Sequence, residues 1–325
     1  MAGFLLTAVP SWTGQRGIAG APLVGLVVLW LAGRCVASLP LGLAPAVIAV
    51  VDLAFFPVLA LAVLPSLVRS GNRRNAIFFG FITLLFAANL HFYIAGAAST
   101  APLRLTLNTV MVMVTVVGGR IVPAFTSATL KKRGVNVPIP GHAFLDGGSV
   151  VAVLAVLAGD VLWPESVISG WLAAMAAAML TLRLARWQSH LTLRDPLVWV
   201  LHLAYAWLPI ALALKAAWLL AGAMDAVTWV HALTAGAFAT MILGVMSRAS
   251  LGHTGRPLVA GRAMTAAYLA LTAAALARVF GPTLAPGAWV AWLAGAAALW
   301  SAAYLLFVFV YAPILWGPRA DGRPG

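Results

Sequence analysis

The chain has 325 residues, of which 63% are hydrophobic and only 8% carry a charge, and its formal net charge is +13. Soluble domains have roughly 25% charged residues, so this composition excludes a soluble enzyme and a disordered chain. In a membrane protein, an excess of Lys and Arg is an orientation signal, so it requires no nucleic-acid partner. The single cysteine, Cys35, excludes an internal disulfide and any CxxC motif.

Ten segments are long and apolar enough to cross a bilayer as helices, which takes roughly 20 residues each. The breaks between them are short and rich in Gly, Pro, Arg and Asn. The sequence therefore predicts an all-α fold, a polytopic transmembrane helix bundle that forms a single integral membrane domain over residues 1–325. In chain order, the predicted spans are residues 21–39, 43–67, 75–96, 103–122, 143–163, 167–184, 196–220, 226–247, 260–280 and 288–312.

Residues 1–10 precede the first full span and are apolar, but they are too short to cross a bilayer. A signal peptide begins with a positive region and ends at a small-residue cleavage site, and this segment has neither. We interpret it as a partial helix, the second half of a helix that descends from the outer side.

The positive charges predict the orientation of the spans. With the C-terminus in the cytoplasm and ten alternating spans, most of the 20 Lys and Arg residues fall on the inner side. This asymmetry is the one that bacterial inner-membrane proteins show. The chain is therefore predicted to be a multi-pass inner-membrane protein whose main partner is the lipid bilayer.

Several local strings are more specific than composition explains, and together they resemble the NnrS family of bacterial inner-membrane proteins. They occur in the family's order through nearly the whole chain. They are GFLLTAVPSWTG (residues 3–14), WLAGR (30–34), RIVPAFT (120–126), LHLAY (201–205), HALT (231–234) and MSRASLGHTGR (246–256).

The resemblance implies a polytopic protein associated with haem and copper. It also implies a role linked to nitric oxide, in denitrification or in resistance to nitrosative stress. Family members usually carry a first helix and a His-x-His-Glu-Met stretch before the segment that resembles residues 3–14. This sequence begins at Met1 inside that second helix, so we expect it to be truncated at the N-terminus and to lack those histidines.

Two histidines are predicted to lie at a similar depth near the outer face. His91 is near the outer end of the third span, and His231 is about five residues below the outer end of the eighth. Neutral imidazole suits both iron and copper, so an outer haem or copper site could use both side chains. The alternative for each is a core histidine that hydrogen-bonds a neighbouring helix.

His202 is predicted to lie toward the cytoplasmic side of the seventh span, with Tyr205 one turn further along the same helix face. It could be an axial ligand of a second haem. The sequence favours instead a hydrogen bond within the bundle.

A candidate anion patch is predicted on the inner side, at the string LGHTGR. The two glycines of this string would let backbone N–H groups approach an anion, such as a haem propionate or a lipid phosphate. The patch could comprise Arg120, Arg248, His253 and Arg256. The alternative for these arginines is simple anchoring on the cytoplasmic side.

Arg34 and Asp52 lie on consecutive spans joined by a tight turn, at similar depths. An ion pair between them would remove two isolated charges from lipid. We expect it to hold the hairpin together, with a proton relay as the alternative. Asp160, Glu165 and Asp225 fall in outer loops and are expected to be solvated.

The sequence thus predicts an NnrS-like haem and copper protein that binds or senses nitric oxide or supports the assembly of metalloenzymes. The alternative is a secondary transporter of a small solute, since ten short-looped helices with a few buried charges also fit that class. No Walker loop, HExxH motif or GxSxG elbow occurs, which favours a protein that is not an enzyme.

Overall fold

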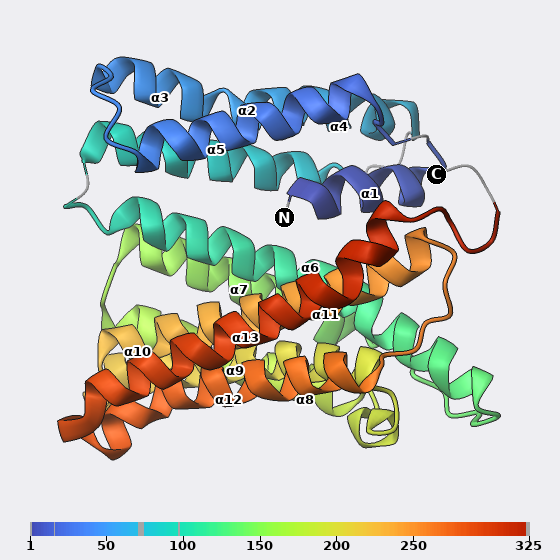
Figure 1. The fold of residues 1–325 in the computed structure, drawn as a ribbon. Helices are drawn as coiled ribbons and strands as arrows, with labels where there is room; N and C mark the ends of the chain where they lie inside the picture. The colour runs from blue at the N-terminus through green and yellow to red at the C-terminus, as the bar shows by residue number, and fades with distance from the viewer. Residues whose placement is uncertain (1, 16, 71–74, 97, 323–325) are drawn as a thin grey trace. The chain divides into compact units, whose positions relative to one another are not determined.

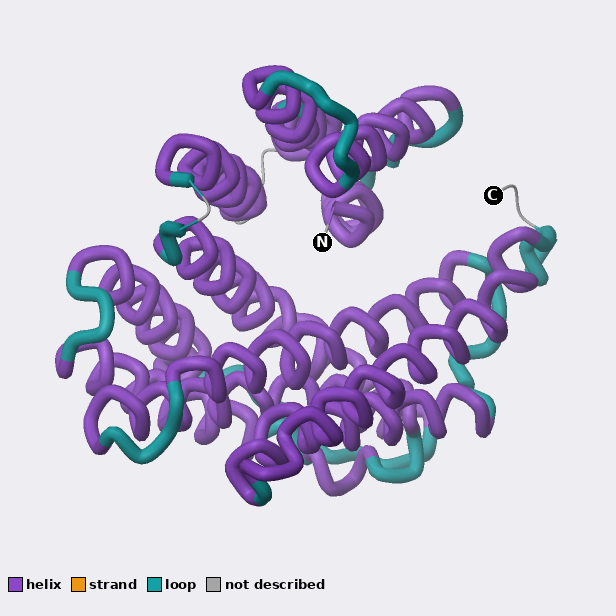
Figure 2. Tube along the Cα trace, turned by 60° about the vertical axis from the view of Figure 1, so that its left-hand side comes forward, coloured by secondary structure: helices purple, strands orange, loops and turns teal. Residues whose placement is uncertain are grey.

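The computed structural model describes residues 2–15, 17–70, 75–96 and 98–322, and within these ranges it contains helices and loops but no strand (Figure 2). Ten of the described helical segments are long and apolar enough to cross a membrane, which confirms the predicted all-α polytopic fold. The contacts within the chain group it into two units, Met1–Val110 and Met111–Gly325. The boundary lies inside α6 (Ala101–Lys132), and each unit is described by itself.

The first unit contains the first five helices and the beginning of α6 (Figure 1). Within it, α4 packs against α1, α2 and α5, while α3 packs against α2 and α5. The helices are α1 (Ala2–Thr13), α2 (Ala21–Ser38), α3 (Pro45–Leu53), α4 (Phe55–Ser70) and α5 (Ile77–Ala95).

The second predicted span is interrupted, because α3 ends at Leu53 and α4 begins at Phe55. Pro57 has no N–H group to bond the Leu53 carbonyl one turn earlier, which weakens the helix at this point. The break lies two residues after Asp52, a buried carboxylate.

The second unit is built around α9, which has buried residues along most of its length and is contacted by α8, α10, η3, α11 and α12. Two helical hairpins, α7–α8 and α12–α13, complete it (Figure 1). Its elements are the rest of α6, α7 (Ala143–Leu162), α8 (Val167–Ala185), η2 (Ser189–Thr192), α9 (Pro196–Ala221), α10 (Ala226–His231), η3 (Ala232–Phe238), α11 (Ala239–His253), α12 (Arg262–Leu284), η4 (Pro286–Ala288) and α13 (Trp289–Trp316).

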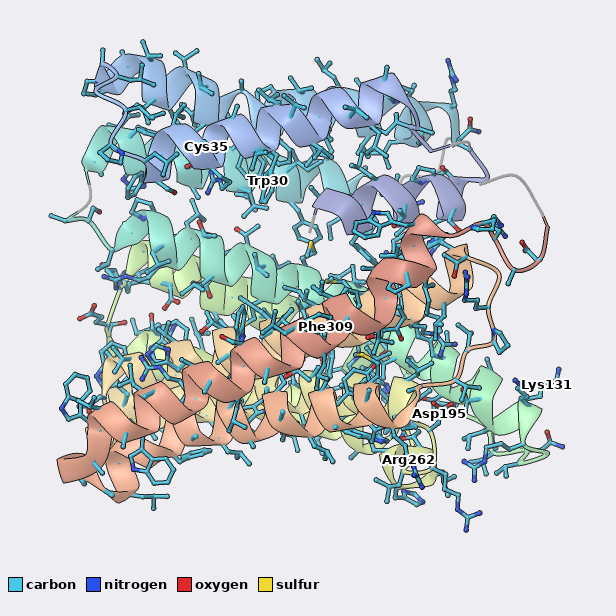
Figure 3. The ribbon with its side chains drawn as sticks, viewed as in Figure 1. Trp30, Cys35, Lys131, Asp195, Arg262 and Phe309 are labelled. Carbon is cyan, nitrogen blue, oxygen red and sulfur yellow. The ribbon has the colours of Figure 1, made fainter. Side chains whose placement is uncertain are left out.

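Local sequence explains where α9 begins and ends. The Asp195 side chain accepts a hydrogen bond from the Leu197 N–H at 3.1 Å and caps the helix, and Pro196 occupies the first helical position. Gly222, with φ of 60°, ends it in the left-handed conformation. In Figure 3, Asp195 lies at the end of the unit where α6 finishes and α12 begins.

Two spans extend more than about five residues beyond their predicted ends. The fourth was expected to end at residue 122, before Pro123, but α6 continues to Lys132. Proline is tolerated inside membrane helices because neighbouring groups satisfy the freed backbone carbonyl. The eighth was expected to end at residue 247 but extends to His253, and its middle part, η3, is a π-helix that begins directly after His231.

Candidate functional site

Two adjacent glycines on α6 let large polar side chains lie directly against this helix. A Cβ on Gly118 would lie 2.9 Å from Cδ2 of Tyr205, and a Cβ on Gly119 would stand where the Arg183 guanidinium lies. Tyr205 is on α9 and Arg183 is near the end of α8. Glycine permits this approach because it has no Cβ. Helices α6, α8 and α9 therefore meet at one buried arginine.

Arg183 is 5% exposed and lies at the centre of a hydrogen-bond network. Its Nε donates to Oδ1 of Asp146 at 2.8 Å, and its Nη1 donates to the Thr115 carbonyl and the Tyr205 hydroxyl, each at 3.1 Å. The Trp187 ring centre lies 5.5 Å from the guanidinium carbon. A buried cation needs a counter-charge and hydrogen-bond partners, and these neighbours supply both.

His202 lies next to this network and is 4% exposed. The Thr126 hydroxyl donates its proton to the Val122 carbonyl at 2.8 Å, so it accepts from Nε2 of His202, 2.7 Å away. Nε2 accordingly carries the ring proton, and Nδ1 accepts from the Ser189 hydroxyl at 2.8 Å. Both ring nitrogens of this histidine are engaged by hydroxyl groups.

Three of the strings singled out in the sequence meet in this region. RIVPAFT contributes Thr126 to His202 of LHLAY. The same string contributes Phe125, whose ring centre lies 3.9 Å from the guanidinium carbon of Arg248 in MSRASLGHTGR. Segments far apart in the sequence are thus joined by specific polar and cation–π contacts.

A pocket of about 120 Å³ opens beside Arg183, where α7 begins and α8 ends. His142 caps α7 there: its Nδ1 accepts from the Leu145 N–H at 3.3 Å, and its own N–H donates to Oδ2 of Asp146 at 2.8 Å. The pocket is lined by Gly119, Pro123, Ile139, Pro140, Gly141, His142, Leu145, Asp146, Arg183, Arg186 and Trp187.

The residues of the predicted anion patch have separate surroundings. Arg120 is exposed on α6, and Arg248 stacks on a phenyl ring as described above. His253 is not in a loop as expected but is the exposed last residue of α11. Nη1 of Arg256 donates to the Ile314 carbonyl at 3.4 Å. No hydrogen bond joins Arg248, His253 and Arg256 in the part of the chain that the structure describes.

A carboxylate does approach Gly255, one of the two glycines of the string LGHTGR, but this carboxylate is a side chain of the same protein. A Cβ on Gly255 would lie 2.5 Å from Cγ of Asp321. Arg319 pairs with this carboxylate at 2.6 Å and donates to the His253 carbonyl at 2.9 Å. The hydrogen bond to Asp321 raises the pKa of the Arg319 guanidinium. The C-terminal segment therefore packs on the end of α11.

His231 and His91, the predicted metal ligands, belong to different units. Nη2 of Arg278 lies 2.5 Å from Nε2 of His231. Arginine can only donate, so this nitrogen accepts and the ring proton is on Nδ1. His91 is exposed on α5. Across the described residues, no group of three or more His, Cys, Asp or Glu side chains is placed to hold a metal ion.

Comparison with known families shows the family of the chain. A family model described as NnrS protein matches residues 1–319. The chain belongs to the NnrS family. No curated protein and no solved structure matches it.

The donor groups of this NnrS-family chain bear on the cofactors that the family resemblance implied. Among the described residues, they do not fit a copper centre, because no three suitable ligands come together. A haem iron requires only one protein nitrogen. His202 has neither ring nitrogen available, and His231 offers Nε2 only if Arg278 moves away.

In the first unit, the NnrS-family chain brings Arg34 and Asp52 together as an ion pair. Asp52 is 4% exposed, and its other oxygen accepts from Nδ2 of Asn89 at 2.8 Å and from the Tyr93 hydroxyl at 3.2 Å. Gly33 leaves room for this carboxylate, since a Cβ there would lie 3.0 Å from Oδ1. Asp52 on α3 is thus bound by side chains of both α2 and α5.

A second buried ion pair lies in the other unit, between Asp160 at the end of α7 and Lys215 on α9. The side chains are 3% and 2% exposed, and the Trp229 ring centre lies 4.5 Å from Nζ of the lysine. The expectation that Asp160 is solvated is therefore wrong. It lies in the last turn of its helix and faces α9 instead of water.

Sequence reasoning missed several residues of these networks. Arg183 is not among the candidate residues that the sequence predicts, although the adjacent glycines on α6 are a signal of close packing. Arg278 and Lys215 are not among those candidates either. A cation inside a predicted span is itself the signal, because it must have a partner in the bundle.

Proposed function

We propose that this chain is an inner-membrane protein of nitric-oxide physiology that binds haem, with its C-terminus in the cytoplasm. The match of the NnrS family model over residues 1–319 carries the proposal. The ten apolar helices support the membrane location. Within this role, the chain binds or senses the gas or supports the assembly of metalloenzymes.

His231 is the residue that we propose for the haem iron. It directly precedes a π-helix inside a predicted membrane span, and such local changes of helix type are frequent at functional sites. Binding through Nε2 requires Arg278 to release the imidazole. Arg120, Arg248, His253 and Arg256 lie in the same unit and remain candidate contacts, and His91 in the other unit remains a separate candidate ligand. The haem would supply the iron that coordinates the gas. The protein would provide one imidazole ligand and exclude water from the site.

Absorption spectroscopy tests this proposal. The full chain, expressed with haem supplied and purified in a mild detergent, is expected to show a Soret band that shifts when nitric oxide is added to the reduced protein. His231→Ala is expected to weaken or shift the band. His190→Ala, which changes an exposed histidine on η2, is the matched control and should leave it unchanged.

A chain that is helical and monodisperse but stays colourless with haem supplied would refute the haem proposal. A band that persists unchanged in His231→Ala would refute the assignment of this histidine, and His91→Ala would then be the next variant to measure.

A further inference from the structure

The pocket beside Arg183 has the size and the donors of an anion site. Its walls combine the α6 backbone at Gly119 and Pro123 with the loop that precedes α7 and the end of α8. A water molecule in the liquid takes up about 30 Å³, so a pocket of about 120 Å³ has room for one phosphate-sized oxyanion.

Arg183 has one nitrogen left for a ligand. Its hydrogen bonds use Nε and Nη1, and Nη2 donates to no group among the described residues. Gly119, which also lines the pocket, is the neighbour of Nη2. A buried guanidinium with a free N–H edge at a cavity is suited to bind an oxyanion, because arginine donors match oxyanion geometry.

Two further donors line the same pocket. His142 accepts through Nδ1, so in its neutral form Nε2 carries the proton and donates. Arg186 is exposed at the C-terminal end of α8 and adds a full positive charge at the pocket wall. Three side chains, two from the end of α8 and one from the residue that precedes α7, can therefore donate to one bound group.

Among the described residues, Asp146 is the one carboxylate that lines the pocket, and both of its oxygens are hydrogen-bonded. Oδ1 accepts from Arg183, and Oδ2 accepts from the His142 N–H. Its charge offsets that of Arg183, which leaves Arg186 as the net positive charge of the pocket. The lining as a whole favours an anion.

We propose that this pocket is a binding site for a phosphate-sized oxyanion, held by Arg183, Arg186 and His142. The ligand is either a free anion or the phosphate group of a membrane lipid, since both present the same chemistry to the same donors. The proposal goes beyond the haem-binding role and does not depend on it.

Equilibrium dialysis of the full chain in a non-ionic detergent and a phosphate-free buffer tests the site, with radiolabelled inorganic phosphate as the probe. We expect saturable binding with a Kd of about 1 mM or lower. Arg186→Gln should weaken it about tenfold, as expected for the loss of one charge-assisted hydrogen bond. Asp146→Asn should strengthen it, because it removes the negative charge beside Arg183. Arg262→Gln, at the same end of the unit but outside the pocket lining, should bind like the native chain (Figure 3).

A second arm identifies the source of the ligand. The chain is placed in phosphatidylcholine nanodiscs with and without phosphatidate, and the retained phosphatidate is measured for the same variants. Binding of inorganic phosphate with the expected variant order supports a free anion, and the same order for phosphatidate alone supports a lipid. The proposal is overturned if neither probe binds saturably, or if Arg186→Gln and Asp146→Asn bind like the native chain.

Discussion

Removing Lys215 alone is expected to be far more damaging than removing the whole ion pair. Lys215 and Asp160 are 2% and 3% exposed, so neither charge can be hydrated in place. Lys215→Met leaves a carboxylate that has lost its cation in a low-dielectric interior, which costs about 3–5 kcal/mol of unfolding free energy. The contact of Nζ with Trp229, 4.5 Å from the ring centre, adds about 1–2 kcal/mol to the loss.

Replacing both partners with apolar side chains removes the buried charges together. The double variant Lys215→Met, Asp160→Val is therefore expected to be more stable than either single variant, and to lie within about 1–2 kcal/mol of the native chain. The double-mutant cycle then gives the coupling of the two side chains directly.

Reversible unfolding of the four proteins in mixed dodecyl maltoside and SDS micelles, followed by circular dichroism, measures these differences. Arg262→Gln, which removes an exposed charge at the start of α12, is the control and should match the native chain. The reasoning fails if Lys215→Met is as stable as the native chain, or if the double variant loses the sum of the two single losses.

Two further predictions concern the contacts of α6, and a third concerns the membrane topology. Thr126→Val should cost about 1–3 kcal/mol in the same unfolding assay, because it leaves a buried imidazole N–H without an acceptor, whereas Thr126→Ser should be close to native. Gly119→Ala should cost about 1–3 kcal/mol of unfolding free energy, because its methyl group overlaps the buried guanidinium of Arg183. Gly147→Ala is the control and should not destabilise the chain, because the space around its new Cβ is open. Equal effects of the two variants would contradict this packing. In a cysteine-free variant, an impermeant maleimide should label Asp225→Cys in intact cells but Lys131→Cys only after permeabilisation; the opposite result would invert the proposed topology.

The fold could be predicted from the sequence because span length and apolar content are properties of each segment alone. The structure departs from the predicted spans where contacts with a neighbouring helix determine the local conformation. The fourth span is predicted to end at residue 122, yet α6 continues through Pro123 to Lys132. The hydrophobic pattern does not predict the π-helix after His231, because one extra residue in a turn does not change the composition of the segment.

Ion pairs between segments that are distant in the sequence are equally hard to predict. Arg34 and Asp52 are separated by 18 positions on a tight hairpin, so their contact follows from depth alone. Arg183 and Asp146 are 37 positions apart, and Lys215 and Asp160 are 55 apart. Depth places such residues at one level, but which helix faces they occupy depends on packing that a single sequence does not encode in a readable pattern.

The scarcity of acidic residues explains where they are found. The chain has 7 Asp and Glu residues against 20 Lys and Arg, so most cations cannot have a carboxylate partner. Three of the carboxylates, Asp52, Asp146 and Asp160, each pair with a cation inside a predicted span or at its end. Cations in loops need no such partner, because water and lipid phosphates solvate them. Loss of one of these three carboxylates should therefore destabilise the fold more than loss of an exposed arginine such as Arg262, since only the former leaves a charge in the bundle without compensation.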